Sequence, residues 1–155
     1  MKILITGGCG FVGSNLAIYL TKKSSKYKIY SLDNLHRDGS KINMKRLHSF
    51  GIKNYKLDIS NNNLSSLPRF DLIIDCCAET AIEDSKKIPK KVFYTNLVGT
   101  FNLLEKIKKE KSKVIFLSSS RVYSIKKLNS LIKNKKKKIL PKIKIDETFS
   151  NDSPI

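Results

Sequence analysis

Ile3-Leu4-Ile5-Thr6-Gly7-Gly8-Cys9-Gly10-Phe11-Val12-Gly13 is the stretch that decides the fold of this chain. Its apolar start is typical of a buried strand, and the residues after it place apolar side chains at helical spacing. Gly7 suits a tight turn, Gly10 lets a pyrophosphate approach, and Gly13 lets the helix lie close to the strand. The free N–H groups and the dipole of that helix favour an anion. This Gly-x-x-Gly-x-x-Gly segment predicts a dinucleotide-binding turn, and a turn without a ligand is the alternative.

An acidic residue follows where a second strand is expected to end. Asp33 comes directly after the strand-like run 27–32 and twenty residues after Gly13. A carboxylate at this place accepts hydrogen bonds from an adenosine ribose and repels a 2′-phosphate, which favours NAD over NADP. Two alternatives stay open. Asp33 and Asn34 could form only a turn, and Arg37 could accept a phosphate.

Short apolar runs alternate with helical patterns along the first 118 residues, which is typical of α/β proteins with a parallel sheet. The expected strands are 2–6, 28–32, 53–57, 71–76 and 113–118, and the expected helices are 11–23, 40–50, 61–67 and 90–110. Pro89 suits the first turn of the last helix. The pattern predicts a Rossmann-type doubly wound sheet in the order 3-2-1-4-5, with a cofactor over the carboxyl ends of its strands.

Several motifs give the chain a family resemblance. Thr6–Gly13 and Asp33-Asn34-Leu35 resemble the start of an extended short-chain dehydrogenase/reductase of the NAD-dependent epimerase/dehydratase branch. Four further segments resemble later motifs of that family and follow one another in the same order: Leu57-Asp58-Ile59, Asp75–Glu79, Asn96–Glu105 and Phe116–Tyr123. The resemblance implies hydride transfer between NAD and a carbon of a nucleotide-sugar substrate, by an epimerase or a dehydratase. Within the family, the chain is most similar to CDP-paratose/CDP-tyvelose 2-epimerases.

The resemblance also implies the site residues. The implied cofactor contacts are Gly7, Gly10, Phe11, Val12, Gly13, Asp33, Asn34, Asp58, Ile59, Cys77, Ala78 and Asn96. The implied catalytic hydroxyl is that of Ser119, which would hydrogen-bond the reacting oxygen. A strand-end serine that only bonds the backbone is the alternative. Asp75, Cys77 and Glu79 depart from the residue types usual in the family.

The family's general base is the tyrosine of a Tyr-x-x-x-Lys motif. Tyr123 and Lys127 spell this motif, but the family has a longer loop between the serine and the tyrosine, so their being the true pair is only an alternative. We therefore expect a sheet incomplete at its C-terminal side and a chain truncated before the motif. Residues 1–123 would form the NAD-binding domain, and 124–155 a basic insertion loop toward a missing catalytic helix and substrate domain. The nucleotide-sugar site would be mostly missing, and a homodimer stays open for the full-length form.

Composition bounds the other classes of function. The chain has 155 residues and a net charge of +18, mostly from lysine. Such a charge makes a basic nucleic-acid-binding protein one alternative. Aromatic residues are not interleaved with the basic runs, however, so the block Lys133–Lys138 is expected to be a solvated loop and a nucleic-acid partner is not expected. A non-catalytic NAD-binding module is the other alternative.

The sequence also predicts where the protein resides. No apolar stretch is long enough to span a membrane, and Met1-Lys2 leads straight into a core strand, so neither a membrane partner nor a signal peptide is expected. Cys9, Cys76 and Cys77 show no metal-ligand spacing and predict no metal site. Adjacent cysteines on a buried strand behave as small apolar residues, which fits a reduced, cytoplasmic setting.

Overall fold

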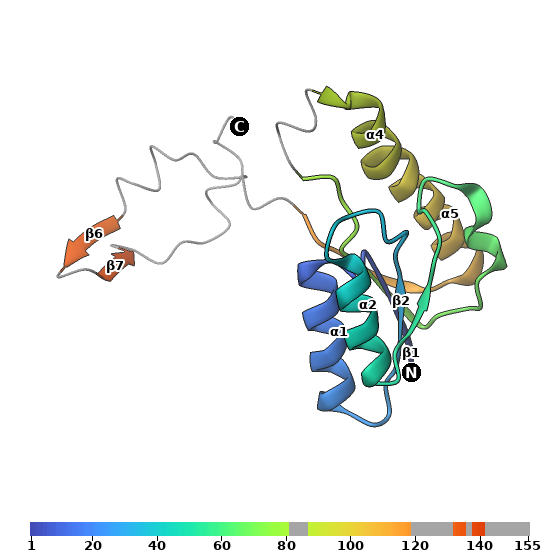
Figure 1. Ribbon diagram of the computed structural model, residues 1–155, viewed down its shortest axis with the longest axis horizontal. Helices are drawn as coiled ribbons and strands as arrows, with labels where there is room; N and C mark the ends of the chain where they lie inside the picture. Colours follow the sequence, from blue (N-terminus) through green and yellow to red (C-terminus); the bar gives the residue numbers. More distant parts are fainter. Residues whose placement is uncertain (81–86, 119–131, 136–137, 142–155) are drawn as a thin grey trace. The chain divides into compact units, whose positions relative to one another are not determined.

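The structure is a computed structural model that describes residues 1–80, 87–118, 132–135 and 138–141 (Figure 1). The chain divides into two compact units, Met1–Leu117 and Ser118–Ile155. The strands of the first unit are β1 (Lys2–Thr6), β2 (Lys28–Leu32), β3 (Lys53–Tyr55), β4 (Leu72–Asp75) and β5 (Lys113–Phe116). Its helical elements are α1 (Phe11–Lys23), α2 (Ser40–Ser49), the 3₁₀ helix η1 (Asn62–Ser66), α4 (Pro89–Phe93), the π-helical turn η2 (Tyr94–Val98) and α5 (Gly99–Glu110).

The five strands form one parallel sheet in the order β3-β2-β1-β4-β5. This is the predicted doubly wound order, and the Rossmann-type α/β fold is confirmed. The chain reverses its direction of travel across the sheet between β1 and β4, which is where ligands bind in such folds.

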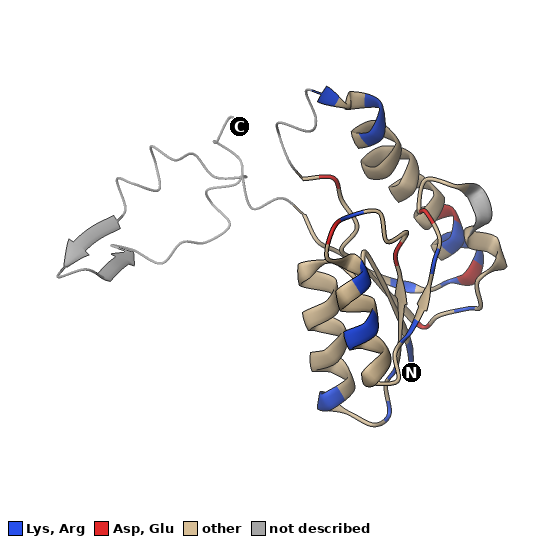
Figure 2. Cartoon of the chain, viewed as in Figure 1, with Lys and Arg blue, Asp and Glu red and all other residues tan. Residues whose placement is uncertain are grey.

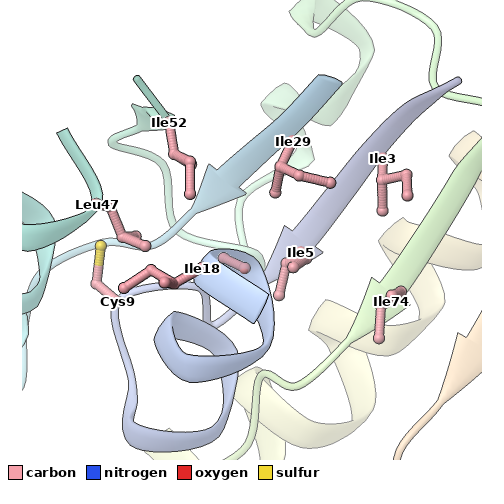
Figure 3. Close-up of a cluster of buried hydrophobic side chains, with 9 residues drawn as sticks. Ile3, Ile5, Cys9, Ile18, Ile29, Leu47, Ile52 and Ile74 are labelled. Atoms are coloured by element: carbon pink, nitrogen blue, oxygen red, sulfur yellow. The ribbon is translucent and has the colours of Figure 1, made fainter. Parts of the chain in front are cut away.

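Alternate residues of β1 enter two different cores, because successive side chains of a strand point to opposite faces of the sheet. Ile3 and Ile5 lie in one buried cluster with residues of α1 and α2, among them Ile18 and Leu47 (Figure 3). Leu4 lies in the other cluster, together with residues of α5 and η1. Figure 1 shows α1 and α2 on one side of the sheet and α5 on the other. Both faces of β1 are therefore dry, as its continuous apolar sequence requires.

The long helix predicted over 90–110 is wrong in its middle. The segment begins at Pro89 as predicted, but η2 interrupts it with a π-helical turn before α5 continues. Tertiary contacts flank this turn: a Cβ on Gly99 would lie 2.5 Å from Ile59 Cγ2, so α5 starts close against the loop after β3. The helical spacing of apolar residues does not depend on such a tertiary contact. The sequence therefore predicted one regular helix.

The second unit corrects another prediction. Lys133–Lys138 was expected to be a loop, but β6 (Ile132–Lys135) and β7 (Lys138–Pro141) pair antiparallel, with Lys135 opposite Lys138. Lysine and asparagine are disfavoured in strands, and no Asn-Gly or Asp-Gly pair marks a hairpin turn. The sequence therefore did not predict the pairing of β6 with β7. The expected domain boundary at 123 lies outside the described residues.

Basic residues occur on helices from different parts of the chain rather than in one segment. Figure 2 shows lysine and arginine on α1, α2, α4 and α5. Within the described ranges, no helix has the length and apolarity needed to cross a membrane.

Candidate functional site

The turn between β1 and α1 has the shape that its glycines predict. Gly7 has a φ of +59°, and a Cβ there would lie 2.8 Å from the carbonyl oxygen of Cys76, at the end of β4. A Cβ on Gly13 would collide with the carbonyl oxygen of Gly7. Gly10 donates its N–H to the same oxygen, at 2.9 Å. Gly7 and Gly13 therefore bring the start of α1 against the carboxyl ends of β1 and β4.

The N-terminus of α1 offers free hydrogen-bond donors. Gly10 is the N-cap residue, no side chain caps the helix, and its first turn holds no acidic residue. The first N–H groups of a helix lack partners within that helix, and the dipole makes this end positive. The side chains of Phe11 and Val12 are exposed beside these donors. The arrangement suits a diphosphate, with apolar side chains that a bound ligand would cover.

The carboxylate of Asp33 is fixed at the end of β2. Its Oδ2 accepts the N–H of Cys9 at 3.0 Å, and its Oδ1 accepts the N–H of Leu35 at 2.8 Å. Only 9% of Asp33 is exposed, and Leu35 has a φ of +60°, which is uncommon for a residue with a side chain. Each carboxylate oxygen keeps a lone pair for a further donor. The carboxylate of Asp33 is thus oriented between the glycine turn and its own loop, where it can accept hydrogen bonds from ribose hydroxyls.

Asn34 and Asp58 connect the loops after β2 and β3. Asn34 Nδ2 donates to Asp58 Oδ2 at 2.8 Å. The other oxygen of Asp58 accepts the N–H of Ser60 at 2.9 Å and its hydroxyl at 2.6 Å. Burial acts to raise the pKa of Asp58, but the hydrogen bonds from Ser60 and Asn34 outweigh it and hold the pKa below its usual range. Asp58 is therefore an ionised brace between two loops of the site.

The end of β4 carries a buried acid and two neutral thiols. Asp75 is 2% exposed, and its Oδ1 accepts the hydroxyl of Thr6 and, at 3.2 Å, the N–H of Cys77. Its Oδ2 has no partner among the described residues. Burial raises the pKa of Asp75, and it raises the pKa of Cys76 to about 11 and of Cys77 to about 12. The two thiols are therefore protonated at neutral pH and are poor nucleophiles.

Asp75→Asn is expected to change how stability depends on pH. Because burial raises the pKa of Asp75, the folded chain holds this proton to higher pH than the unfolded chain does. The contribution of protonated Asp75 to stability is complete below its pKa in the unfolded chain, about 4. It is lost as pH rises through the higher pKa of Asp75 in the folded chain. The asparagine of the variant would not titrate. Urea unfolding at a series of pH values is expected to show the variant gaining stability relative to the parent as pH rises from about 4 to 7. A difference that stays constant over this range would contradict the assignment.

Glu79, in the loop after β4, joins three parts of the site. Its Oε2 lies 2.6 Å from Arg37 Nη2, and its Oε1 lies 3.0 Å from Lys91 Nζ on α4. Its backbone N–H donates to Asn96 Oδ1 at 2.8 Å, and its carbonyl accepts Asn96 Nδ2 at 3.0 Å. The amide of Asn96, which belongs to the π-helical turn, is thus used to hold this loop in place.

These groups surround one cleft of about 270 Å³ at the carboxyl ends of the strands. Of the predicted cofactor residues, the cleft is lined by Gly7, Gly10, Phe11, Val12, Gly13, Asp33, Asn34, Asp58, Ile59, Cys77 and Ala78. Asn96 does not line it, although its neighbour Thr95 does. Ser119 lies outside the described residues, as do Tyr123 and Lys127.

The cleft is also lined by nine residues that the sequence did not predict as cofactor contacts. The further lining residues are Leu32, His36, Arg37, Ser40, Leu57, Cys76, Glu79, Thr80 and Thr95. Four of them, Leu32, Leu57, Cys76 and Glu79, stand next to a predicted residue at a strand end, so the carboxyl-end rule could have included them. Thr95 had no such signal, because it reaches the cleft through the π-helical turn. In the described part of the chain, no cluster of His, Cys, Asp and Glu could hold a metal ion.

The chain resembles known proteins in sequence and in structure. The model of the "NAD dependent epimerase/dehydratase family" matches residues 3–141. A dTDP-D-glucose 4,6-dehydratase of Dictyostelium discoideum is 40% identical over 128 residues, which cover 79% of this chain and 30% of that protein. A CDP-paratose 2-epimerase of Salmonella typhi is 36% identical over 132 residues, which cover 79% of this chain and 38% of that protein.

A solved structure gives the same result for the fold. The UDP-glucuronic acid 4-epimerase Y149F mutant from Bacillus cereus, in complex with a fluorinated UDP-sugar and NAD, has a TM-score of 0.72 and 31% identity. The match covers 80% of this chain and 42% of that one. The chain therefore spans 30 to 42% of the length of these relatives. Since the family model matches most of its residues, the chain belongs to the NAD dependent epimerase/dehydratase family.

Proposed function

We propose that this chain is the NAD-binding part of a nucleotide-sugar epimerase or dehydratase. One observation carries the proposal: the uncapped N-terminus of α1 and the oriented carboxylate of Asp33 line the same cleft. Donors for a diphosphate and an acceptor for a ribose thus lie on two sides of one site. The family match and a structural relative solved with NAD support the same cofactor.

The residues present fit NAD, and each has a role in the proposal. The first N–H groups of α1 bind the diphosphate, and Asp33 accepts the hydroxyls of the adenosine ribose. Asp58 and Asn34 keep the loops in register around the adenosine. NAD, when bound, supplies the acceptor for a hydride from a sugar carbon. Ser119 is proposed to hydrogen-bond the reacting oxygen of that sugar.

For the substrate we propose a CDP-sugar that is epimerised at C2. The likeness of the segments Gly8–Phe11 and Asp33–Leu35 to such epimerases supports it, as does the 36% identity to CDP-paratose 2-epimerase. The 40% identity to a dTDP-D-glucose 4,6-dehydratase favours dehydration of a dTDP-sugar as the second candidate. The two candidates are separated by which nucleotide-sugar the full-length form converts. The proposed compartment is the reducing cytoplasm, supported by the three unpaired cysteines.

For the full-length form we propose a homodimer. An apolar stripe supports this part of the proposal: Phe93, Leu97, Phe101 and Leu104 are all exposed along one helical segment. Their spacing of three and four residues puts them on one side of the helix. An exposed stripe of this kind is typical of a helix that packs against another helix.

The proposal predicts a preference for NAD. Calorimetric titration is expected to show NAD binding at least about tenfold more tightly than NADP, because the carboxylate of Asp33 repels a 2′-phosphate. Asp33→Ala is expected to weaken NAD binding and to narrow the difference. Asp38→Ala is the matched control, since Asp38 is exposed in the same loop and does not line the cleft. Equal affinities for NAD and NADP in the parent chain would contradict the role of Asp33.

A polypeptide of residues 1–155 is expected to bind NAD without converting CDP-, dTDP-, UDP- or GDP-sugars. Abstraction of a hydride requires a base within hydrogen-bond reach of the sugar hydroxyl. Asp33 and Asp58 are proposed to serve the adenosine end of NAD, and Glu79 is paired with Arg37 and Lys91, so none of the acids that line the described cleft is placed to act as that base. Product analysis by chromatography, with NAD present, measures turnover. If the chain is active and Tyr123→Phe abolishes that activity, Tyr123 and Lys127 are the catalytic pair.

A further inference from the structure

We infer that Glu79 is a second determinant of nucleotide preference, because it occupies the one arginine that could serve a 2′-phosphate. This inference rests on the proposed NAD site. Arg37 and Asp33 line the same cleft, and Arg37 is the only Lys or Arg side chain among its lining residues in the described part of the chain. A guanidinium at such a place would normally favour a phosphate. In this chain its Nη2 lies 2.6 Å from Glu79 Oε2.

The carboxylate of Glu79 is held in place independently of Arg37. Asn96 binds both the N–H and the carbonyl of Glu79, which fixes the backbone of the loop after β4. Lys91 Nζ binds the second carboxylate oxygen at 3.0 Å. The side chain is only 11% exposed. The partner that Arg37 meets is therefore a built acceptor rather than a mobile surface acid.

Glu79 is also charged when it meets Arg37. Burial acts to raise the pKa of Glu79, but the hydrogen bonds from Lys91 and Arg37 outweigh it and hold the pKa below its usual range. An ionised carboxylate compensates the charge of the guanidinium and accepts a hydrogen bond from its Nη2. The Arg37 side chain is itself half-exposed, so it would be free to turn toward a ligand if this acceptor were weakened.

The pairing affects only one of the two nucleotides. NADP needs a cation for its 2′-phosphate, whereas NAD presents hydroxyls at that place and needs the acceptor Asp33. Glu79 thus withdraws the cation while Asp33 supplies the repulsion. The two acids belong to different loops, after β4 and after β2, and act on the same discrimination. This accounts for an arginine in the ribose loop of a chain whose other features favour NAD.

Glu79→Gln tests the inference, since it keeps the shape and removes the charge. Calorimetry at fixed ionic strength is expected to show NADP binding about tenfold tighter than in the parent chain, while the affinity for NAD changes less than about twofold. Adding Arg37→Met to Glu79→Gln is expected to return NADP binding to the parent value. Arg37→Met alone is expected to leave the NAD to NADP ratio unchanged, because the guanidinium is already occupied.

Lys90→Met removes one positive charge near the site and is the matched control for Arg37→Met. Lys90 stands next to Lys91 on α4, but its Nζ lies over the ring of Tyr94 and does not contact Glu79. A gain in NADP binding by Glu79→Gln that survives Arg37→Met would overturn the inference, as would no gain. If Glu79→Gln does not fold, Arg37→Met decides: weaker NADP binding in that single variant shows that Arg37 already serves the phosphate. If the parent chain does not bind NAD at all, the proposed function is overturned instead.

Discussion

Gly10→Val is expected to weaken NAD binding by at least about 100-fold, because it blocks the donors that hold the diphosphate. Outside the neighbouring residues Cys9 and Phe11, the Gly7 carbonyl oxygen, at 3.1 Å, is the one described atom within 4 Å of a Cβ built on Gly10. A branched side chain would thus extend into open space beside the free N–H groups of α1. The φ of −73° at Gly10 suits any L-residue, so the fold is expected to survive. Calorimetry measures the affinity, and circular dichroism checks the helix content.

A graded series at the same position serves as the control. Gly10→Ala adds one methyl group and is expected to fall between the parent chain and Gly10→Val in affinity for NAD. The glycine turn keeps its two structural glycines, Gly7 and Gly13, in both variants. If Gly10→Val folds and binds NAD as the parent does, the cofactor does not lie against this turn.

Lys106→Ala is expected to lower the free energy of unfolding by about 3–5 kcal/mol, as when one partner of a buried ion pair is removed. The Lys106 side chain is 3% exposed. Its Nζ binds the carbonyl oxygen of Leu67 at 3.1 Å and Glu110 Oε1 at 2.6 Å, and lies 5.9 Å from the centre of the Phe70 ring. Alanine would leave Glu110 without its cation and a cavity beside Phe70.

Urea unfolding measures this effect, and Lys108→Ala is the matched control. Lys108 is exposed on the same helix, α5, so its loss is expected to change stability by less than about 0.5 kcal/mol. A cost of Lys106→Ala no greater than that of Lys108→Ala would show that the buried ion pair contributes nothing to the fold.

The sequence predicted the sheet well because its signals are local. β1, β2 and β4 are short runs rich in apolar residues, helical patterns lie between the strands, and the glycine turn fixes how β1 leads into α1. The sheet order then follows from rules on parallel crossovers, and the structure confirms it. The π-helical turn at Tyr94–Val98 and the hairpin of β6 and β7 were not predicted. Both depart from what residue propensities favour, so periodicity and composition could not show them.

The site was predicted where its residues follow strand ends and missed where loops meet. Asp33 was found from its distance to Gly13, and it lines the cleft. The ion pair of Arg37 with Glu79 joins residues 42 positions apart, on loops whose conformations no local pattern specifies. Asn96 was predicted to contact the cofactor, whereas in the structure its side-chain amide hydrogen-bonds the backbone of Glu79. Such long-range pairings depend on the assembled fold.

The most direct test of the NAD site is a titration with NAD followed by the amide resonances of the chain. The account predicts that the largest shifts fall on Gly8–Gly13, around the start of α1, and on Asp33–Leu35, with smaller shifts at Cys77–Glu79. Lys133–Lys138, in the second unit, is expected to show none at physiological salt. Shifts that are confined to Lys133–Lys138, or none at a saturating concentration of NAD, would contradict an NAD site at the carboxyl ends of the strands.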